Sequence, residues 1–394
     1  MEYETTHPWI NFKLNIGANY EPLWYNLGRA CSKIRHLSQS AVAPEVHQQL
    51  NHVYLVKGVV GTTSIEGNTL SEDEVSAIVD NKLTLPPSKQ YMEQEVTNVV
   101  QACNKIVQDT CSEQPPALTP SYIAELNAML LSGMKLEDDI HPGQTRHYSV
   151  LVGRYRGAPA HECDYLLERL CTWLQSDDFA APPGMRHAMA ILQAIVAHIY
   201  IAWIHPFGDG NGRTARLVEV FLLLRAGVPV PAAHLLSNFY NKTRSQYYTE
   251  LDKLRRPSGG GVYPSLSAFM NYAVQGLTDG LDEQLALVTN HHLRVIWEHY
   301  IYSRFNTAKR EVSAKRQRDL LLSFGGEEKQ IRNFNDLPGE IFHTYYRDRT
   351  LRTLHRDLRE LCTQNLIEQS SSGIYRPRTE IVRAMLPMRA DAEE

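Results

Sequence analysis

No C-x-x-C pair occurs among the six cysteines of this 394-residue sequence. Zinc ribbons and dithiol redox sites need cysteines at such short spacing, so the pattern argues against both. Scattered single cysteines are typical of reduced thiols in a cytoplasmic protein. None of them is a candidate nucleophile; they lie at Cys31, Cys103, Cys111, Cys163, Cys171 and Cys362.

A signal peptide and a long apolar run are missing as well. Residues 1–13 are polar, contain Pro8 and lack a charged segment followed by an apolar one. No apolar run reads as long enough to span a bilayer. We therefore expect a cytoplasmic protein with no membrane contact.

An excess of positive charge is also absent, since the formal net charge is −4. A protein without a basic field is not a general nucleic-acid or membrane binder, although local basic patches remain open. The hydrophobic content of 43% is enough for a sizeable core, and the length leaves room for two or three domains.

The most informative stretch is a polar loop between two apolar helical patterns, residues 186–204 and 217–224. Three glycines in this loop leave backbone N–H groups uncovered just before the second helix, and such groups bind phosphate. The loop reads His205-Pro206-Phe207-Gly208-Asp209-Gly210-Asn211-Gly212-Arg213, followed by Thr214-Ala215-Arg216.

The charged side chains of this loop suit nucleotide chemistry. Asp209 is an isolated carboxylate beside the phosphate site, which is useful for holding Mg²⁺. Arg213 and Arg216 lie on one helical face and can neutralise phosphate. His205 ends the first helix and can accept a proton. The structural alternative is a glycine-rich connection with a core histidine, but such a turn needs neither the acid nor the arginines.

The loop does not match a P-loop, a dinucleotide fingerprint or a kinase lid. It resembles the signature of the Fic (filamentation induced by cAMP) family, H-P-F-x-[DE]-G-N-G-R, at every fixed position. The resemblance implies transfer of AMP from ATP to a hydroxyl side chain of a target protein. It further implies His205 as the general base, Asp209 as the Mg²⁺ ligand, and ATP contacts from Gly208, Gly210, Asn211, Gly212, Arg213 and Arg216.

A second motif precedes this core. Helices are expected over residues 23–38, 43–64, 71–80 and 89–110, and Gly67 suits the C-cap of the second. The stretch from Thr62 to Gly67 reads as a capped helix end. It also resembles the Fic inhibitory motif [ST]-x-x-x-E-[GN], which implies that Glu66 pairs with Arg216 through two hydrogen bonds and holds the enzyme inactive.

A short β-branched run, Val150, Leu151, Val152 and Gly153, precedes a glycine-rich turn and predicts one arm of a hairpin. It reads either as a surface hairpin without a ligand or, by resemblance, as the Fic flap that holds the backbone of the target like an added strand.

The paired tyrosines Tyr247 and Tyr248 resemble the family's adenine-binding pair, and core packing is the alternative. Because the loop reads phosphates rather than bases, UTP, GTP and CDP-choline also remain open as donors. His198, seven residues before His205, reads as a core or supporting residue rather than a metal ligand.

The C-terminal part changes character. Helices over residues 316–323, 337–346 and 349–364, followed by two short strands, resemble a winged-helix module. Its third helix carries Arg349, Arg352, Arg356 and Arg359, so it could contact DNA, or it could serve protein contacts or dimerisation. We expect a mainly α chain of three parts: a helical region with the inhibitory helix (1–110), a Fic-type core with a small hairpin (111–286) and a winged-helix domain (287–394).

Three functions follow from these patterns. The first is a protein adenylyltransferase that uses ATP and Mg²⁺ and is inhibited by Glu66. Its expected partner is a target protein; a second copy of the chain and DNA at the C-terminal domain remain open as further partners. The second is a winged-helix DNA-binding regulator whose core senses nucleotide. The third is a toxin-type or scaffold protein held inactive by Glu66.

Overall fold

The computed structural model describes residues 1–14, 16, 20–153, 155–257, 263–306, 311–371 and 373–383. The chain divides into two compact units, Met1–Leu285 and Ala286–Glu394. Both are built chiefly of helices, and the strands form one two-stranded and one three-stranded sheet. The predicted mainly α fold is confirmed. The expected regions 1–110 and 111–286 lie together in the first unit.

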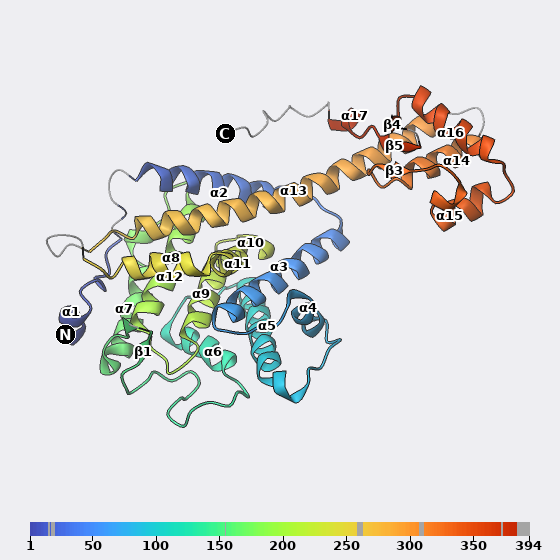
Figure 1. Cartoon of the computed structure of the whole chain (residues 1–394). Helices are drawn as coiled ribbons and strands as arrows, with labels where there is room; N and C mark the ends of the chain where they lie inside the picture. Colours follow the sequence, from blue (N-terminus) through green and yellow to red (C-terminus); the bar gives the residue numbers. More distant parts are fainter. Residues whose placement is uncertain are drawn as a thin grey trace. The chain divides into compact units, whose positions relative to one another are not determined.

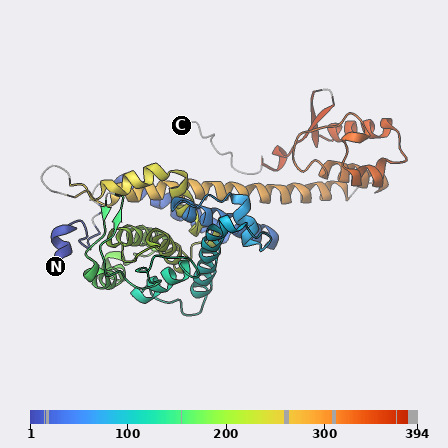
Figure 2. The same ribbon diagram turned by 60° about the horizontal axis from the view of Figure 1, so that its bottom comes forward.

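The centre of the first unit is a pair of helices, α8 (Arg186–Ile204) and α9 (Asn211–Arg225), joined by the polar loop. Most other helices of the unit pack against this pair (Figures 1 and 2). Those in direct contact with α8 or α9 are α2 (Glu21–Gln39), α3 (Pro44–Ile65), α5 (Gln90–Thr110), α6 (Pro120–Leu130), α7 (Cys163–Leu174), η3 (Asp177–Phe179) and α10 (Val230–Ala233). The unit also contains α1 (Glu2–Thr6), α4 (Glu72–Val79), η1 (Pro87–Lys89), η2 (Ala160–Glu162), α11 (Leu235–Lys242) and α12 (Arg244–Lys253).

Helix α8 is apolar on all sides because it lies in the middle of the unit. Among the described residues it is the one helix long and apolar enough to cross a membrane, and 83% of its most apolar 18-residue stretch is buried inside the protein. The expectation that no apolar run reaches that length is therefore wrong. Apolar residues all around a helix are typical of a core helix as well as of a membrane span.

Helix α3 reaches the polar loop because two glycines let it approach α11 closely. A Cβ at Gly61 would lie 2.7 Å from the carbonyl oxygen of Ser237, and a Cβ at Gly58 would lie 2.7 Å from Nδ1 of His234. Real side chains do not tolerate such contacts, so α3 could not occupy this position with alanine at either site.

The end of α3 is determined by local hydrogen bonds. Glu66 is the C-cap, and Gly67 follows with φ of +107°. The Gly67 N–H donates to the carbonyl of Ser64 at 3.0 Å, and the Asn68 N–H donates to the carbonyl of Thr63 at 3.2 Å. This is a Schellman motif, as the glycine suggested. The next helix, α4, begins with a reciprocal capping box.

The predicted hairpin is present between α6 and α7. Strands β1 (Leu151–Val152) and β2 (Tyr155–Arg156) pair antiparallel. The N-terminal segment packs beside this hairpin, although the sequence predicts no element there. His7 Nε2 lies 3.0 Å from the carbonyl oxygen of Arg156. Inside the unit, the hydroxyl of Tyr155 donates to the carbonyl of Trp203 on α8.

One long helix, α13 (Ser267–Phe305), contributes its first part to the first unit and its last part to the second. It runs without interruption through the expected boundary at residues 286 and 287. Within the first unit, Gly276 and Gly280 lie directly against Phe239 and Leu235 of α11, where a Cβ would clash.

The second unit contains the helices and the hairpin that the sequence predicts. Its elements after α13 are α14 (Glu311–Leu322), β3 (Lys329–Gln330), η4 (Phe334–Asp336), α15 (Gly339–Ile341), a π-helical turn (Phe342–Tyr346), α16 (Leu351–Thr363), β4 (Ile367–Ser371), β5 (Ile374–Pro377) and α17 (Glu380–Arg383). The strand order is β3-β5-β4. Strand β3 was missed because two residues carry no detectable period.

Candidate functional site

The polar loop begins at a strained histidine. His205 is the C-cap of α8, with φ of +50° and ψ of +60°, a conformation that non-glycine residues seldom adopt. Its imidazole is half-buried. Burial lowers the pKa of His205 to about 4. The ring is therefore neutral near pH 7 and able to accept a proton, and such strained residues cluster at functional sites.

The loop is held rigid by two asparagine side chains. Asn211 accepts a hydrogen bond from the Phe207 N–H at 2.9 Å and donates to the Phe207 carbonyl at 2.8 Å. Both bonds tie the start of the loop to the first turn of α9. Asn127 of α6 donates to the Asp209 carbonyl at 2.9 Å. It was not expected, because nothing in its local sequence marks it.

Arg146 is a further residue that sequence reasoning missed. It is buried, and its guanidinium donates to the carbonyls of His205 at 2.7 Å, Tyr148 at 2.6 Å and Ala158 at 2.5 Å. Its own backbone N–H donates to the carbonyl of Pro206 at 2.9 Å. One cation therefore ties the segment before the hairpin to the histidine end of the loop.

The N-terminus of α9 is the expected phosphate-binding end of the loop. Gly210 precedes the helix with φ of +75°, and Gly212 lies in its first turn. The backbone N–H groups here carry the positive end of the helix dipole. In this structure the carboxylate of Glu66 lies against this turn: a Cβ at Gly212 would collide with Glu66 Oε1. A carboxylate thus occupies the space beside the expected anion site.

Glu66 pairs with Arg216, as the inhibitory motif implied. Arg216 Nη2 donates to Glu66 Oε1 at 2.6 Å, and Arg216 is only 1% exposed. Burial alone would raise the pKa of Glu66, but the charge and hydrogen bond of Arg216 outweigh burial and hold that pKa below its ordinary value. Glu66 is therefore ionised at neutral pH and the ion pair is charge-assisted.

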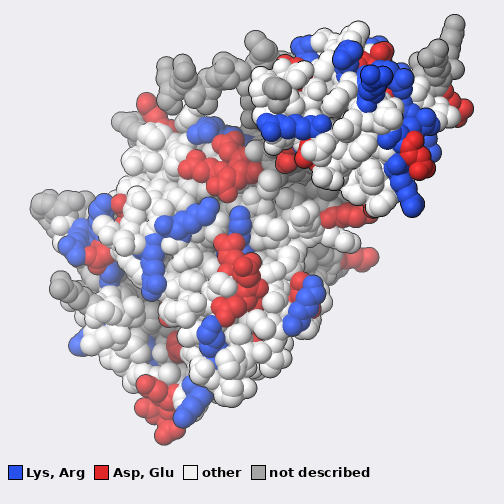
Figure 3. All heavy atoms as spheres, turned by 45° about the vertical axis from the view of Figure 1, so that its right-hand side comes forward, with Lys and Arg blue, Asp and Glu red and all other residues white. Residues whose placement is uncertain are grey.

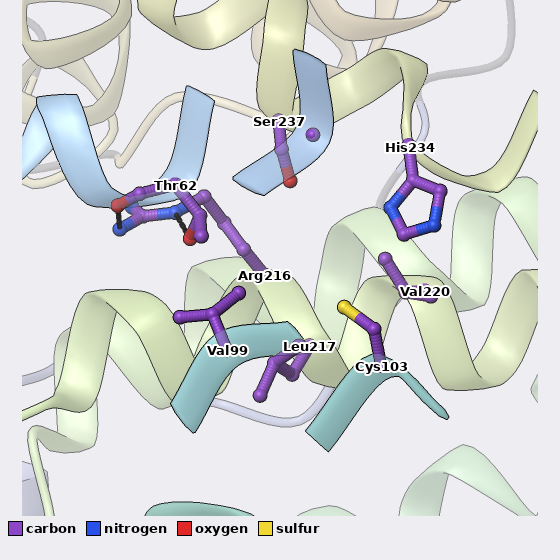
Figure 4. A pocket seen from close by; sticks show the side chains of 9 residues that line it. Thr62, Val99, Cys103, Arg216, Leu217, Val220, His234 and Ser237 are labelled. Carbon is purple, nitrogen blue, oxygen red and sulfur yellow. Dashed lines mark hydrogen bonds between the residues drawn. The ribbon is translucent and has the colours of Figure 1, made fainter. Parts of the chain in front are cut away.

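The expectation of two hydrogen bonds between these side chains is wrong. The second donor, Arg216 Nε, bonds to the hydroxyl of Thr62 at 2.7 Å, and Nη2 also reaches the Thr62 carbonyl at 3.0 Å. Figure 4 shows these contacts, with a small cavity behind Arg216 lined by Cys103, His234 and Ser237 among others. The threonine of the motif therefore anchors the arginine from the α3 side, in addition to Glu66.

Arg213 is also held by carboxylates, which the sequence did not indicate. Its Nη1 donates to Glu95 Oε1 of α5 at 2.7 Å, and its Nη2 lies 3.2 Å from Asp209 Oδ1. Glu95 is 4% exposed, and its other oxygen accepts from Asn68 Nδ2 at 2.8 Å. Glu95 is therefore the fixed partner that orients Arg213 toward the loop.

Replacing Glu95 with Gln is expected to destabilise the protein by about 3 kcal/mol, because it leaves the buried Arg213 charge with only the more exposed Asp209 as counter-ion. A glutamine cannot accept from both Arg213 and Asn68, since one of its two ends is a donor. Urea unfolding measures the loss. The same exchange at Glu168, exposed on α7, is the matched control and should stay within about 0.5 kcal/mol of wild type. An equally small change for Glu95→Gln would contradict this role.

Asp209 can take the cation that the sequence assigned to it. Its side chain is 39% exposed, and Oδ1 accepts from Arg213 and from the Gly210 N–H. Over the described ranges, Oδ2 has no hydrogen-bond partner. Mg²⁺ is usually held by one or two carboxylates together with substrate phosphates and water. The side chain therefore fits an ion that arrives with a nucleotide, and no group of three or more His, Cys, Asp or Glu among the described residues forms a complete metal site.

The two tyrosines occupy different environments. Tyr247 is buried, and its hydroxyl lies 2.8 Å from Nε2 of His198, which in turn lies 3.1 Å from Glu219. Tyr248 is 43% exposed, and its hydroxyl donates to the carbonyl of Ile65, in the last turn of α3, at 3.5 Å. Core packing explains Tyr247 and His198. Stacking on a base is open to Tyr248.

The hairpin presents an unpaired strand edge to solvent. Leu151 is 66% exposed and Val152 is 44% exposed, while Val150 accepts from the Gly157 N–H at 3.1 Å. Gly153 forms the turn with φ of +59°. Because Arg146 joins the base of the hairpin to the loop, a peptide added to this edge would approach the loop.

Comparisons with known proteins agree with this geometry. Residues 117–223 match the model of the Fic/DOC family. The chain is 27% identical over 223 residues to the protein adenylyltransferase fic-1 of Caenorhabditis briggsae, covering 56% of this chain and 40% of that protein. It is 28% identical over 231 residues to the protein adenylyltransferase Fic of Nematostella vectensis, covering 58% and 48%. The chain thus spans less than half the length of these curated relatives.

Solved structures share the fold. The crystal structure of a Fic family protein from Desulfovibrio desulfuricans G20 aligns with 90% of this chain and 96% of its own, with a TM-score of 0.53 and 20% identity. Residues 134–508 of Fic-1 from C. elegans align with 68% of this chain and 73% of theirs, with a TM-score of 0.54 and 21% identity.

Proposed function

We propose, because this chain carries a Fic domain over residues 117–223, that it is a protein adenylyltransferase. It would transfer AMP from ATP to a Tyr, Thr or Ser hydroxyl of a target protein and of itself. The observation that carries the proposal is the loop at α9. A neutral histidine, a glycine-rich helix N-terminus, one carboxylate and two arginines lie there within twelve residues.

Each part of the loop has one task in this reaction. The backbone at Gly208, Gly210 and Gly212 and the guanidinium of Arg213 bind the phosphates. His205 removes the proton from the acceptor hydroxyl as its oxygen attacks the α-phosphorus, and pyrophosphate leaves as that bond breaks. Positioning and charge stabilisation account for most of the rate in such transfers.

In this proposal, the contact with Glu66 and Thr62 keeps Arg216 from binding the nucleotide. Arg216 is the second arginine of the loop and is the one proposed to hold the γ-phosphate. While its guanidinium is bound to Glu66 and Thr62, the γ-phosphate has no cation there and the α-phosphorus lies out of line. We propose that this contact inhibits the enzyme.

Mg²⁺ bound by Asp209 would neutralise the phosphate charges. Exchanging Asp209 for Ala is expected to weaken Mg²⁺-dependent ATP binding about tenfold or more and to lower transfer in parallel. Titration calorimetry with ATP, with and without Mg²⁺, measures the binding arm independently of activity. The control is Asp138→Ala, which removes an exposed carboxylate from the segment after α6. Unchanged Mg²⁺ dependence in Asp209→Ala would remove it as the ligand.

The direct test of the proposed activity is intact-mass spectrometry of the protein, and of a host lysate, after incubation with ATP and Mg²⁺. A mass increase of one AMP on the chain or on a lysate protein is the expected result. UTP, GTP and CDP-choline, offered in parallel, identify the donor. A homodimer and a cytoplasmic location are further proposals from the sequence.

A further inference from the structure

The C-terminal unit carries a row of arginines on the outer face of α16. Three leucines of this helix are buried in the unit, while Arg352, Arg356 and Arg359 are exposed. The buried leucines are Leu354, Leu358 and Leu361. Spacings of four and three residues place them on one side of a helix. Arg349 is exposed just before its first turn. In Figure 3, Lys and Arg side chains gather over this unit.

Within the described part of this unit, these four arginines form no ion pair with an acidic side chain. In residues 311–371 and 373–383, the ion pairs formed by other arginines go to Asp319, Asp357, Glu368 and Glu380, and none involves the row on α16. Arginine suits the binding of anions, because the donors of its guanidinium group match the oxygens of carboxylates and phosphates.

The acidic residues on and beside α16 do not neutralise the charge of these arginines. Asp357, on the inner face of α16, is buried and bound by Arg316 through contacts of 2.6 and 2.9 Å. Asp348 and Glu360 are exposed, but neither forms an ion pair in the described part of the chain. The inner charge is neutralised inside the unit, and the outer face is left positive.

The arginine face continues into the β4–β5 hairpin. His355, on the same side of α16, lies 3.3 Å through its Nε2 from the carbonyl oxygen of Arg332. The side chain of Arg332 lies against Gly373 at the hairpin turn, where a Cβ would come within 2.6 Å of Arg332 Cγ. Helix, Arg332 and hairpin turn therefore form one surface, and Arg332 adds another exposed cation to it.

We propose that this surface binds double-stranded DNA, with α16 in the major groove and Arg332 and the hairpin turn on the flanking backbone. At 1.5 Å per residue, the 13 residues of α16 make a rod of roughly 20 Å. The major groove of B-DNA, about 12 Å wide, admits such a helix, whereas that of A-form RNA is too narrow and deep. The proposal concerns one unit alone and does not depend on AMP transfer.

The test is fluorescence anisotropy of the full-length chain with a labelled DNA duplex of about two helical turns. Affinity is measured in KCl between about 50 and 200 mM. Neutralising Arg352 and Arg356 together with Gln should weaken binding about tenfold or more at the lower salt. If each contacts one phosphate, it should also reduce the slope of log affinity against log salt by about 1.8.

The matched control removes two positive charges from the same unit, at the exposed residues Arg304 and Lys315, also with Gln. It should leave the salt slope unchanged. The absence of duplex binding at about 50 mM KCl, or equal weakening by both double variants, would overturn the proposal. Tighter binding of an RNA duplex, or displacement of DNA by an equal charge of poly-glutamate, would assign the surface to RNA or to an acidic protein instead. Auto-modification, measured on the same samples, should be unchanged in both variants.

Discussion

Exchanging Glu66 for Gly is expected to raise auto-modification and target modification about 100-fold. The carboxylate of Glu66 lies against the first turn of α9 and holds Arg216. Removing it would leave the phosphate site open and free the guanidinium for the γ-phosphate. A misplacement of the reacting groups by about 1 Å costs roughly that factor in rate. The rate of AMP incorporation at saturating ATP and Mg²⁺ measures the effect.

Three further variants separate the parts of this argument. Glu45→Gly, at the exposed start of α3, makes the same exchange in the same helix and should leave the rate unchanged. Glu66→Gln keeps an acceptor for Arg216 but removes the charge, so its rate should lie between wild type and Glu66→Gly. Arg216→Ala in the Glu66→Gly background should abolish the gain. If Glu66→Gly labels no faster than wild type, the inhibitory assignment fails and the inactive scaffold becomes the better reading.

The structure also changes the expected stability of Glu66→Gly. From the sequence, a substitution at a helix end should cost little. Arg216 is buried, however, and keeps only Thr62 as its partner in the variant. Loss of a hydrogen bond to a charged group costs about 1.5 to 3 kcal/mol, and the partial exposure of Glu66 places the cost toward the lower end.

Exchanging His205 for Ala is expected to lower transfer by a factor of about 10² to 10⁴, the contribution of a general base. ATP affinity should change little, because proton removal acts on the step and not on ground-state binding. The measurement is best made in the Glu66→Gly background, where the starting rate is high. His36→Ala, exposed on α2, is the control. Full activity in His205→Ala would remove this residue from the mechanism.

The pH dependence provides an independent check on the histidine. Its pKa is lowered to about 4 by burial, so the neutral base is fully present above about pH 5. Transfer should be independent of the state of His205 between about pH 5 and 8 and should fall about tenfold per pH unit below 4. Between the ordinary pKa near 6.5 and pH 4 the unfolded chain binds the extra proton, so stability falls with falling pH in that window. A rate that falls through pH 6.5 would contradict a neutral His205 with a lowered pKa.

Local features of this protein could be predicted because they depend on neighbours in the sequence. The helix end predicted from Gly67 is completed within a few residues, and Gly67 forms a Schellman motif directly after the C-cap Glu66. The loop from His205 to Arg213 is contiguous, so its glycines, base and acid could be recognised together. Strand β3 and the N-terminal segment beside the hairpin were missed, since their structure comes from contacts with distant elements.

The sequence by itself determined the chemistry of the site: a base, an acid, two arginines and open N–H groups at one helix start. Only the tertiary structure decided which groups hold the arginines. Glu66 and Arg216 are 150 residues apart, and Glu95 and Arg213 are 118 apart. These pairs form because Gly58 and Gly61 let α3 approach α11, and because apolar burial packs α3 and α5 against α9. A buried charge needs a partner of opposite sign, and packing decides which side chain lies close enough. The distance between two side chains far apart in the sequence cannot be read from the sequence alone.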